Sequence, residues 1–511
     1  MLSIVETPPP APCPAPFNLA EYVLGGGDQP DKSALQIVGL TGAQRWSYAA
    51  LEAAVRGVGS GFLAAGLAPG DRILLRLGNT IDFPLAFLGA IAAGLVPVPT
   101  SAQLTAPEIT AMAKGLAPAA IVAGTGIALP EHPAMLIGED TLRGWRGLPP
   151  CDWARGDPER LAYMIFTSGT SGRARAVMHA HRAVWARRMM WQGWYGLGAA
   201  DRLLHAGAFN WTYTLGTGLM DPWAIGATAL IPAAGLQAAQ IPLLLKRFDA
   251  TIFAAAPGVY RQMLRAGRLD LPSLRHGLSA GEKLAEPVRR AWHEATGTPI
   301  FEALGMSEVS TYVSASPSRP APAGTLGYAQ PGRRLAVLGA DGAPVARGEA
   351  GELAIDTRDP GLFLGYWGDE GATNARRRNG WFVTGDTVSM DADGAIRYLG
   401  RDDDMLNAGG FRVSPLEIER VFDAHAGIAE SAAVEMPVRE GVSVIALFYV
   451  PRGEPPSEAA LNEHAKAQLA RYKHPRLYRA CPALPRGANN KLNRRSLRDG
   501  HDSAEVSDDQ A

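Results

Sequence analysis

Small hydroxyl residues interleaved with glycines are the part of this sequence that most directly suggests chemistry: Thr167, Ser168, Gly169, Thr170, Ser171 and Gly172. Glycines let backbone N–H groups approach an anion closely, and serine and threonine hydroxyls add hydrogen-bond donors. Arg173 and Arg175 follow and supply positive charge. The segment therefore predicts a phosphate-binding loop. An ordinary surface loop is the alternative, because the GxxxxGK[ST] pattern of P-loops is absent.

Lysine is scarce in this chain, so a lysine inside a motif carries more information than usual. Only seven of the 49 basic residues are lysines, at positions 32, 114, 246, 283, 466, 473 and 491. Arginine can supply surface charge equally well. Lys491 lies among arginines in PRGANNKLNRR and is a candidate functional residue. By contrast, His179 and His181 have no third metal ligand nearby in sequence, and we interpret them as positioned or core histidines.

The elements that must position the loop form an alternating pattern. A buried-strand pattern, 161–166 (LAYMIF), leads into the loop, and elsewhere short β-rich runs alternate with alanine-rich helical stretches. Examples are 72–77 before 83–93, 119–123, and 251–256 before 259–266. This alternation favours an α/β fold with largely parallel sheets. From residue 324 the pattern changes to short strands with Asp-Gly turns, which predicts hairpins in a small β-barrel-like unit.

The last part of the chain predicts a separate α+β domain of about 100 residues. Its expected elements are a helix at 415–425, strands at 429–436 and 442–450, and a helix at 458–470. We therefore expect a large N-terminal domain of layered α/β subdomains followed by a small, mobile C-terminal domain. The expected divisions are a proline-rich lead-in at 1–16, the large domain at 17–402, the small domain at 403–498 and an acidic disordered tail at 499–511.

Composition excludes several classes of protein. With 511 residues, 47% of them hydrophobic, the chain can bury a sizeable core. A net charge of -1 argues against a nucleic-acid binder. Three distant cysteines indicate neither a disulfide framework nor a zinc site. The apolar run 83–99 contains prolines and predicts a buried helix leading into a core strand, and no signal peptide is recognisable, so we expect a cytoplasmic protein without a membrane span.

Five motifs in order resemble those of the acyl-adenylate-forming superfamily, which includes acyl-CoA synthetases, adenylation domains and firefly luciferase. They are the loop in YMIFTSGTSGRARAVMHAHRAV, LGMSE at 304–308, GWFVTGD at 380–386, GRDDDMLNAGGFRV at 400–413 and NKLNR at 490–494. The chemistry agrees, because a carboxylate is inert to thiols, as its leaving group would be oxide, and its conversion to a mixed anhydride with AMP supplies a better leaving group. That step requires a phosphate cradle, a metal, ribose anchors and a cation beside the carboxylate.

The resemblance assigns roles to residues around the nucleotide. Glu308 resembles the residue that helps to hold Mg²⁺ on the ATP phosphates. Asp386 resembles the acceptor of both ribose hydroxyls, and Arg401 resembles a donor to the ribose or phosphate. Arg175 stands where many relatives have lysine, and we expect it to bind pyrophosphate. Further nucleotide contacts are implied for Ala280, Gly281, Glu282, Leu304, Gly305 and Ser307, with Leu304 in the place of a tyrosine that often stacks on adenine.

The resemblance also implies two half-reactions and a rotation of the C-terminal domain between them. Lys491 resembles the lysine that bridges the substrate carboxylate and the α-phosphate, where a compact ammonium offsets the repulsion between two anions. Asp403 matches the hinge residue. Gly409 and Gly410 match the segment that borders the pantetheine tunnel of CoA, and Arg412 is a candidate partner for a CoA phosphate.

The acyl pocket is the least determined part of the site. Residues 205–223 (HAGAFNWTYTLGTGLMDPW) resemble the corresponding region of benzoate-type and medium-chain acyl-CoA ligases. The candidate lining residues are Phe209, Trp211, Tyr213, Gly305 and Met306. Ordinary core packing is the alternative for aromatic residues at this spacing. Since no basic residue stands among them to hold a second carboxylate, we expect a monocarboxylic acid with an aromatic, alicyclic or short to medium aliphatic body.

The resemblance thus predicts an AMP-forming acid–thiol ligase with ATP, Mg²⁺ and CoA as cofactor and co-substrates. One alternative is an enzyme that adenylates the acid and loads the phosphopantetheine of a carrier protein, which the lack of a fused carrier domain disfavours. A second alternative is a non-catalytic nucleotide-binding relative, which the intact Glu308, Asp386 and Lys491 disfavour. We expect a small-molecule acid, ATP and CoA as binding partners, no nucleic acid, and a monomer or homodimer.

Overall fold

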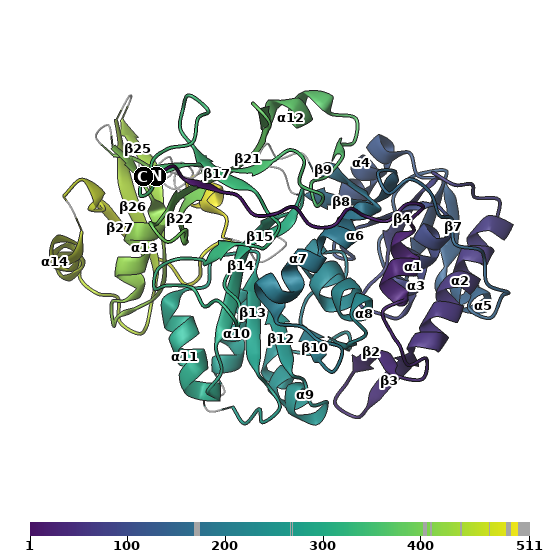
Figure 1. Ribbon diagram of the computed structural model, residues 1–511. Coiled ribbons are helices and arrows are strands. Elements are labelled where there is room, and N and C mark those ends of the chain that lie inside the picture. The colour runs from purple at the N-terminus through teal and green to yellow at the C-terminus, as the bar shows by residue number, and fades with distance from the viewer. Residues whose placement is uncertain are drawn as a thin grey trace.

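The computed structural model describes a large domain and a smaller one (Figure 1). The described residues are 1–167, 174–265, 267, 269–401, 406–408, 411–439, 442–469, 471–486 and 492–498. The small domain lies at one end of the molecule, and the helices and strands of residues 48–145 lie at the other. This division agrees with the expected mixed α/β class.

A nine-stranded sheet forms the centre of the large domain, in the order β16-β15-β14-β13-β12-β10-β11-β2-β3. The strands from β14 to β2 are parallel, and the two edges are antiparallel. The strands are β2 (Ser33–Val38), β3 (Ala43–Ser47), β10 (Arg202–His205), β11 (Thr228–Pro232), β12 (Ile252–Ala255), β13 (His276–Ala280), β14 (Ile300–Met306), β15 (Ser310–Ser314) and β16 (Tyr328–Ala329). The inner strands are buried on both faces, as parallel strands under helices must be.

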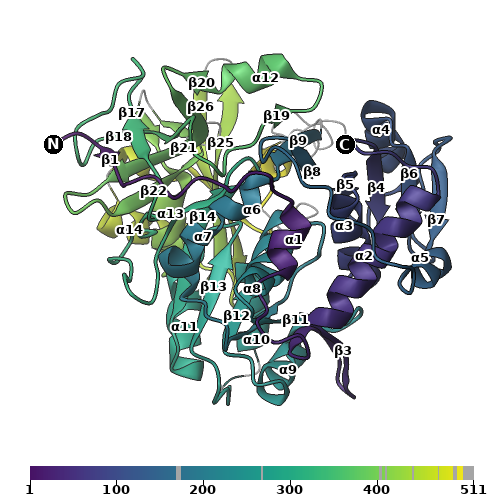
Figure 2. The ribbon, with the colours of Figure 1, turned by 45° about the vertical axis from the view of Figure 1, so that its right-hand side comes forward.

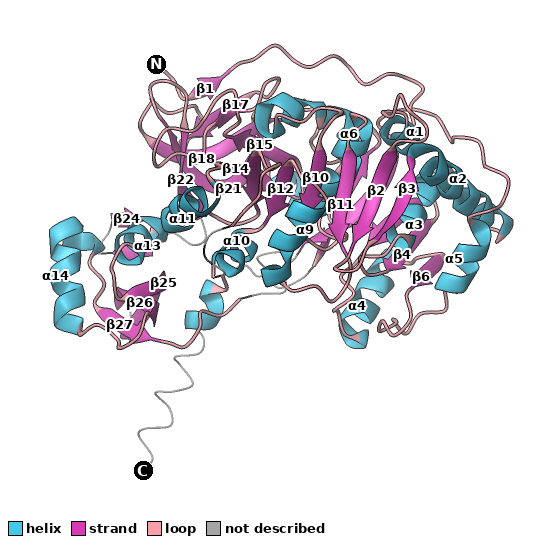
Figure 3. Cartoon of the chain, turned by 90° about the horizontal axis from the view of Figure 1, so that it is seen from below, coloured by secondary structure: helices cyan, strands magenta, loops and turns pink. Residues whose placement is uncertain are grey.

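Helices cover both faces of this sheet (Figure 3). One face packs against the helices that carry Leu244, Tyr260 and Trp292. These helices are α9 (Ile241–Arg247), preceded by the 3₁₀ turn η3 (Ala238–Gln240), α10 (Pro257–Leu264) and α11 (Glu286–Thr296). The other face packs against Trp194 and Tyr213. The helical segments on that side are α6 (Arg182–Ala186), α7 (Arg188–Met190), the π-helices η1 (Trp191–Tyr195) and η2 (Thr214–Met220), and α8 (Asp221–Ala224).

A second, four-stranded parallel sheet follows the same alternation of strands and helices. Its order is β5-β4-β6-β7, with β4 (Arg72–Arg76), β5 (Val96–Pro99), β6 (Ala120–Ala123) and β7 (Met135–Gly138). The apolar run 83–99 forms a buried helix and then a core strand, as predicted. Within the described residues, no helix is long and apolar enough to cross a membrane. The helices of this region are α1 (Leu19–Leu24), α2 (Tyr48–Ala64), α3 (Asp82–Ala92), α4 (Ala106–Leu116) and α5 (Glu139–Trp145).

Two antiparallel sheets complete the large domain. The predicted loop joins β8 (Leu161–Thr167) to β9 (Arg175–Ala180), and β9 also pairs with β19 (Gly365–Tyr366). The six-stranded sheet contains β1 (Ile4–Val5), β17 (Leu335–Leu338), β18 (Ala350–Asp356), β20 (Arg377–Arg378), β21 (Trp381–Met390) and β22 (Ile396–Arg401), and α12 (Glu370–Ala375) lies before β20. One predicted hairpin with an Asp-Gly turn is confirmed, because β21 and β22 pair antiparallel on either side of Asp393-Gly394, where Gly394 has a φ of +90°.

The N-terminal residues predicted as a proline-rich lead-in run along the large domain. Within this segment β1 pairs with β17, and the chain then crosses to α1 on the other side of the large domain (Figure 2). The indole N–H of Trp185 donates to the carbonyl oxygen of Ala11 at 2.9 Å, which fixes its path. The acidic tail predicted at 499–511 lies outside the described residues.

The small domain packs helices against a three-stranded sheet. Its strands are β25 (Ile428–Arg439), β26 (Val442–Pro451) and β27 (Leu477–Ala480), with the separate hairpin β23 (Leu406–Ala408) and β24 (Phe411–Val413). Its helices are α13 (Pro415–Asp423), α14 (Glu458–Gln468) and the 3₁₀ turn η5 (Arg471–Lys473). Proline at the first position of α13 and the Ser457 cap on α14 explain where these helices begin. The predicted elements of this domain are confirmed within a few residues.

Candidate active site

The turn between β14 and β15 carries the acidic motif. β14 ends at Met306 and β15 begins at Ser310, and these two residues pair in antiparallel register. Gly305 lies at a shift in this register, where an added Cβ would be 2.6 Å from the carbonyl oxygen of Ser310, so the position requires glycine. The turn follows the carboxyl end of β14, beside that of β13. This is the edge at which open α/β sheets bind ligands.

Glu308 lies in this turn and is nearly buried, with 7% of its surface exposed. Its Oε1 accepts a hydrogen bond from the Tyr366 hydroxyl at 2.6 Å. Burial, and then the charge of Glu308, raise the pKa of Tyr366, so its phenol remains a donor at neutral pH. The Arg175 guanidinium lies over the same ring, with Cζ 5.4 Å from the ring centroid, and its Nε is 3.4 Å from Asp369 Oδ2. Glu308 and Arg175 are therefore brought together through Tyr366.

Asp386 forms a second corner of the site, beside the hairpin of β14 and β15. Its Oδ2 accepts a hydrogen bond from the Tyr312 hydroxyl at 3.2 Å and its Oδ1 one from the Tyr398 hydroxyl at 3.3 Å. Arg401 pairs with Asp386 across β21 and β22, with Nη1 3.6 Å from Oδ1. Tyr312, on β15, links this corner to the turn with Glu308.

Aromatic residues after β10 form a third corner. Trp211 and Tyr213 pack edge to face, with ring centroids 5.2 Å apart and planes at 89°. Gly281 has a φ of +95°, and an added Cβ would lie 2.6 Å from Trp211 Cζ2. The indole therefore packs directly on the backbone that follows β13. Phe209 does not join this group: it is 1% exposed and packs in the core, with its ring centroid 5.2 Å from that of Phe83.

Several other predicted residues occupy the ends of the central strands. Ala280 ends β13, and Leu304, Gly305 and Met306 end β14, followed by Ser307 in the turn. Thr167 and Arg175 face each other across β8 and β9, the strands that the predicted phosphate loop joins. Outside the described residues lie Ser168, Gly169, Thr170, Ser171, Gly172, Asp403, Gly409, Gly410 and Lys491, and the side chain of Arg412 is also not described.

The small domain contacts this site through Arg486. Its Nη1 donates to Glu282 Oε2 of the large domain at 3.3 Å, and its Nη2 donates to Glu430 Oε2 of the small domain at 2.6 Å. Arg486 also forms an isolated antiparallel bridge with Leu492, so the two ends of the segment that includes Lys491 meet. The contact with Glu282 therefore brings the start of that segment to the predicted adenine-binding residues.

The donor set suits Mg²⁺ bound together with a nucleotide. Mg²⁺ prefers oxygen ligands and is commonly held by one or two carboxylates together with substrate phosphates and water. Glu308 provides such a carboxylate, and the described residues contain no cluster of three or more His, Cys, Asp or Glu that would enclose a metal by itself.

His179 and His181 are buried, and burial lowers the pKa of each to about 3. His181 Nδ1 accepts a hydrogen bond from the Leu19 N–H at 3.0 Å, which gives it a structural place.

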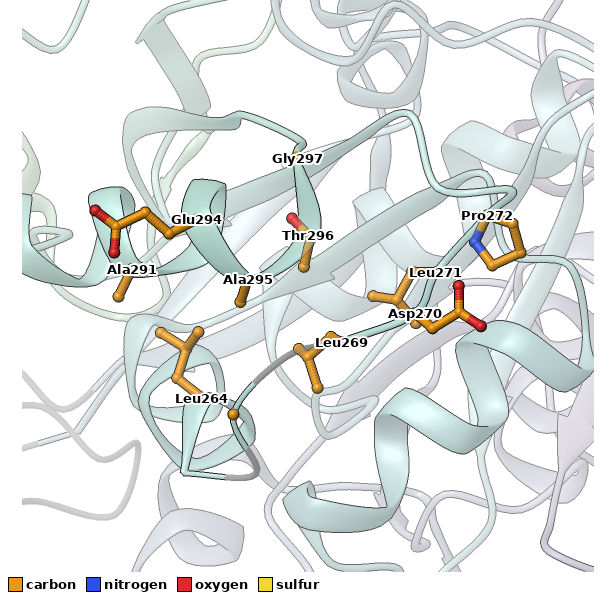
Figure 4. A pocket seen from close by; sticks show the side chains of 11 residues that line it. Leu264, Leu269, Asp270, Leu271, Pro272, Ala291, Glu294, Ala295, Thr296 and Gly297 are labelled. Carbon is orange, nitrogen blue, oxygen red and sulfur yellow. The ribbon is translucent and has the colours of Figure 1, made fainter.

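A separate cavity of about 930 Å³ lies between α10 and α11 (Figure 4). Its walls combine apolar residues such as Leu264 and Leu271 with the polar residues Asp270, Glu294 and Thr296. None of the predicted site residues lines it. The described site residues predicted from the sequence therefore lie away from this cavity, mostly near the carboxyl ends of β13 and β14 and on β9, β21 and β22.

Two sequence-family comparisons decide the family. The model of the AMP-binding enzyme family matches residues 26–367, and that of the AMP-binding enzyme C-terminal domain matches residues 417–491. The chain belongs to the AMP-binding enzyme family. The first match includes Glu308 and Tyr312, and the second includes Lys491, whereas Asp386, Tyr398 and Arg401 lie between the two matched ranges.

Relatives and solved structures of this family align over nearly the whole chain. The 3-hydroxybenzoate–CoA ligase of Aromatoleum sp. (strain CIB) is 30% identical, covering 94% of this chain and 97% of the relative. The benzoate–CoA ligase of Thauera aromatica is 30% identical, covering 96% and 98%. A crystal structure of a benzoate CoA ligase from Burkholderia xenovorans LB400 is 27% identical with a TM-score of 0.83, covering 94% of this chain and 100% of that one.

Sequence reasoning missed the tyrosines that hold the two carboxylates. Tyr366, Tyr312 and Tyr398 donate to Glu308 and Asp386 across separations of 58, 74 and 12 residues, respectively. Tyr312 lies on β15 with its hydroxyl directed to Asp386, but no local sequence pattern identifies this partner. The pairing of β21 with β22 brings Tyr398 to Asp386, whereas Tyr366 and Tyr312 reach their carboxylates only where different sheets pack together.

Proposed function

We propose that this protein is an ATP-dependent carboxylic acid–CoA ligase, an acid–thiol ligase that forms an acyl-AMP and transfers the acyl group to CoA. The observation that carries the proposal is the convergence of two acidic corners on one hairpin. The β14–β15 hairpin bears Glu308 in its turn and Tyr312 on its second strand, and Tyr312 contacts Asp386. A phosphate-bound metal and a ribose would thus be held at neighbouring places, as an adenylate requires.

The residues present divide the work of the first half-reaction. The acid carboxylate attacks the α-phosphorus of ATP, and pyrophosphate leaves. Glu308 would hold Mg²⁺, which neutralises charge on the phosphates, and Arg175 supplies a cation for the departing pyrophosphate. Asp386 would orient the ribose. Lys491 would bring the carboxylate and the α-phosphate together, and its removal should therefore affect this step most.

In the second half-reaction the CoA sulfur attacks the acyl carbon, AMP leaves, and a thioester forms. We propose that the small domain rotates about Asp403 and that Gly409, Gly410 and Arg412 then bind CoA. The proposed divisions are 1–16, 17–402, 403–498 and 499–511. A cytoplasmic location and a monomeric or homodimeric state are further predictions, checked by cell fractionation and by sedimentation.

The acid is proposed to be a monocarboxylate with an aromatic body. The partly exposed Trp211 indole, which packs edge to face with the buried Tyr213 ring, offers an apolar surface suited to a flat ring, since aromatic pairs favour offset or edge-to-face contacts. Two of the aligned relatives are named for benzoate and 3-hydroxybenzoate. Alicyclic and short to medium aliphatic acids fit the same apolar surface and belong in the test.

The test is a panel of carboxylic acids assayed both for pyrophosphate release and for CoA thioester. We expect both products with at least one aromatic monoacid, and neither without Mg²⁺. Pyrophosphate without thioester would favour transfer to a carrier-protein phosphopantetheine. Neither product with any acid would favour a non-catalytic nucleotide-binding relative and would refute the ligase.

A further inference from the structure

Arg187 and Asp221 form a buried ion pair that the reaction described above does not use. Arg187 Nε lies 2.8 Å from Asp221 Oδ1, and Nη2 lies 2.6 Å from Oδ2, so the pair is bidentate. Only 6% of Arg187 and 1% of Asp221 are exposed. A buried pair of this kind adds little stability over a well-packed apolar pair. Its remaining contacts therefore deserve a functional explanation.

The third arm of the guanidinium reaches the turn that carries Glu308. Arg187 Nη1 donates to Ser310 Oγ at 2.5 Å. Ser310 has a φ of +75°, a left-handed conformation that a side chain normally disfavours. It closes the turn by pairing with Met306. The hydrogen bond from Arg187 thus holds a strained residue at the end of the loop that presents Glu308.

The same pair is anchored in the helices behind the aromatic corner. The Tyr195 hydroxyl, from the π-helix η1, donates to Asp221 Oδ2 at 2.7 Å and lies 2.9 Å from Thr217 Oγ1. Thr217 belongs to the π-helix η2, which begins directly after Tyr213. π-Helical segments are costly and are frequent at functional sites. One buried network therefore connects η2, the helix behind Trp211 and Tyr213 (the acyl corner), with the turn that carries Glu308 (the metal corner).

We propose that Arg187 is a positioning residue: fixed by Asp221, it clamps Ser310 in the left-handed conformation and so sets the position of Glu308 for Mg²⁺-bound ATP. This inference rests on the proposed function, because it concerns the carboxylate that would hold the metal. Glu308 is held at its carboxylate by Tyr366 and through its backbone by this clamp. Loss of the clamp should weaken binding of the nucleotide without altering the acyl corner.

The test compares two substitutions that leave the ion pair intact. Ser310→Ala removes the hydroxyl but keeps the strain, whereas Ser310→Gly removes both, because glycine adopts a positive φ freely. For Mg·ATP binding measured by calorimetry without acid, we expect a loss of about tenfold in Ser310→Ala, typical of a lost hydrogen bond to a charged group. Ser310→Gly should stay within about threefold of the original protein. The KM for the acid should not change.

Ser314→Ala is the matched control, since its hydroxyl lies on the same strand and donates to the carbonyl oxygen of Gly193 at 2.8 Å. It should bind Mg·ATP normally. Arg187→Lys should weaken Mg·ATP binding in the original protein but have less effect in the Ser310→Ala background, since the two changes remove one contact. Unchanged binding by Ser310→Ala, or equal losses in Ser310→Ala and Ser310→Gly or in the control, would overturn the proposal.

Hydrogen exchange of the amides of residues 306–310 separates this inference from the proposed function. The amides should exchange faster in Ser310→Ala than in the original protein or in Ser310→Gly, whether or not the protein is a ligase. An original protein that binds no Mg·ATP and releases no pyrophosphate would refute the ligase while this readout still tests the clamp. Equal exchange in all variants would refute the clamp even in an active ligase.

Discussion

Glu308 is almost completely buried. In the hydrogen bonds described above, only one of its two carboxylate oxygens has a partner. Tyr366 donates to Oε1, and the 7% exposure of the side chain excludes most water. Partners of a metal ligand fix its orientation, and removing one commonly weakens metal binding. At the residue scale, we therefore expect metal binding to depend on the hydroxyl of Tyr366 as well as on the acidic motif.

Tyr366→Phe should raise the Mg²⁺ concentration needed for half-maximal pyrophosphate release by about fivefold, the effect of one hydrogen bond. The rate at saturating Mg²⁺ should change little, because the carboxylate itself remains. Tyr328→Phe is the control: its hydroxyl also donates to a carboxylate, Asp393 at 3.0 Å, but outside the site. An unchanged Mg²⁺ requirement in Tyr366→Phe would remove this tyrosine from the metal corner.

Lys491→Ala should lower acid-dependent pyrophosphate release by about a hundredfold or more, because the two anions then approach without a compensating cation. Thioester formation from supplied acyl-AMP should persist, since the carboxylate no longer has to approach a phosphate. Lys466→Ala, which removes an exposed partner of Glu463, is the control for loss of a lysine in the same domain. Normal adenylation by Lys491→Ala would exclude the proposed role.

At the scale of elements, local patterns predict which segments form strands and helices but not which residues meet. The buried run at 251–256 and the helical pattern at 415–425 appear as β12 and α13. The contact of Tyr366 with Glu308, in contrast, depends on β19 adding to β9, and the Arg187 network depends on two π-helices. Neither feature has a periodicity in the sequence, because both arise only when distant elements pack.

Gly281→Ala tests how the segment after β13 shapes the acyl corner. The added Cβ would collide with the Trp211 ring, so we expect a several-fold change in KM for the acid, in addition to a loss of about 1 kcal/mol in stability from the left-handed backbone. Gly297→Ala has the same backbone strain, with a φ of +75°, but no atom within 4 Å of the added Cβ. It should lose stability and keep its KM. Equal KM values in both variants would place Trp211 outside the acyl corner.

At the scale of the whole molecule, charged residues lie at the boundary between the two domains. Arg486 contacts Glu282 across this boundary. Burial lowers the pKa of Lys283 in the large domain. The negative charges of Glu302 and, from the small domain, Glu419 raise that pKa and oppose the effect of burial. The sequence motifs indicate a rotating domain but not its position, because such long-range charge contacts have no local signature. We expect the domain position with the Arg486–Glu282 contact to be the one used for adenylation.

Arg486→Gln should therefore slow pyrophosphate release several-fold more than it slows thioester formation from supplied acyl-AMP. The substitution removes the cation that joins Glu282 to the small domain, and we expect this contact to matter only in the first half-reaction. Arg452→Gln is the control, because Arg452 Nε donates within the small domain, to the carbonyl oxygen of Ile428 at 2.8 Å. Equal slowing of both half-reactions by Arg486→Gln would contradict a role specific to this domain position.

Asp423 gives the molecule a predicted pH dependence of stability. It lies at the end of α13, and burial raises its pKa to about 7, opposed by a hydrogen bond from Ser431 Oγ at 2.8 Å. Glu419 and Glu430 add to the shift, and Lys283 of the large domain lies within electrostatic reach.

Since an unfolded aspartate has a pKa of about 3.9, the folded protein binds this proton more tightly, and the group's contribution to stability declines as pH rises from about 4 to 7. Asp423→Asn should remove this decline. The difference between the free energy of unfolding by urea of Asp423→Asn and that of the original protein should grow in favour of the variant between about pH 4 and pH 7. It should reach at most a few kcal/mol and then level off. Asp140→Asn, at a side chain that is 95% exposed, should show no such trend. Parallel pH profiles for Asp423→Asn and the original protein would show that this carboxyl does not titrate near neutrality in the folded state.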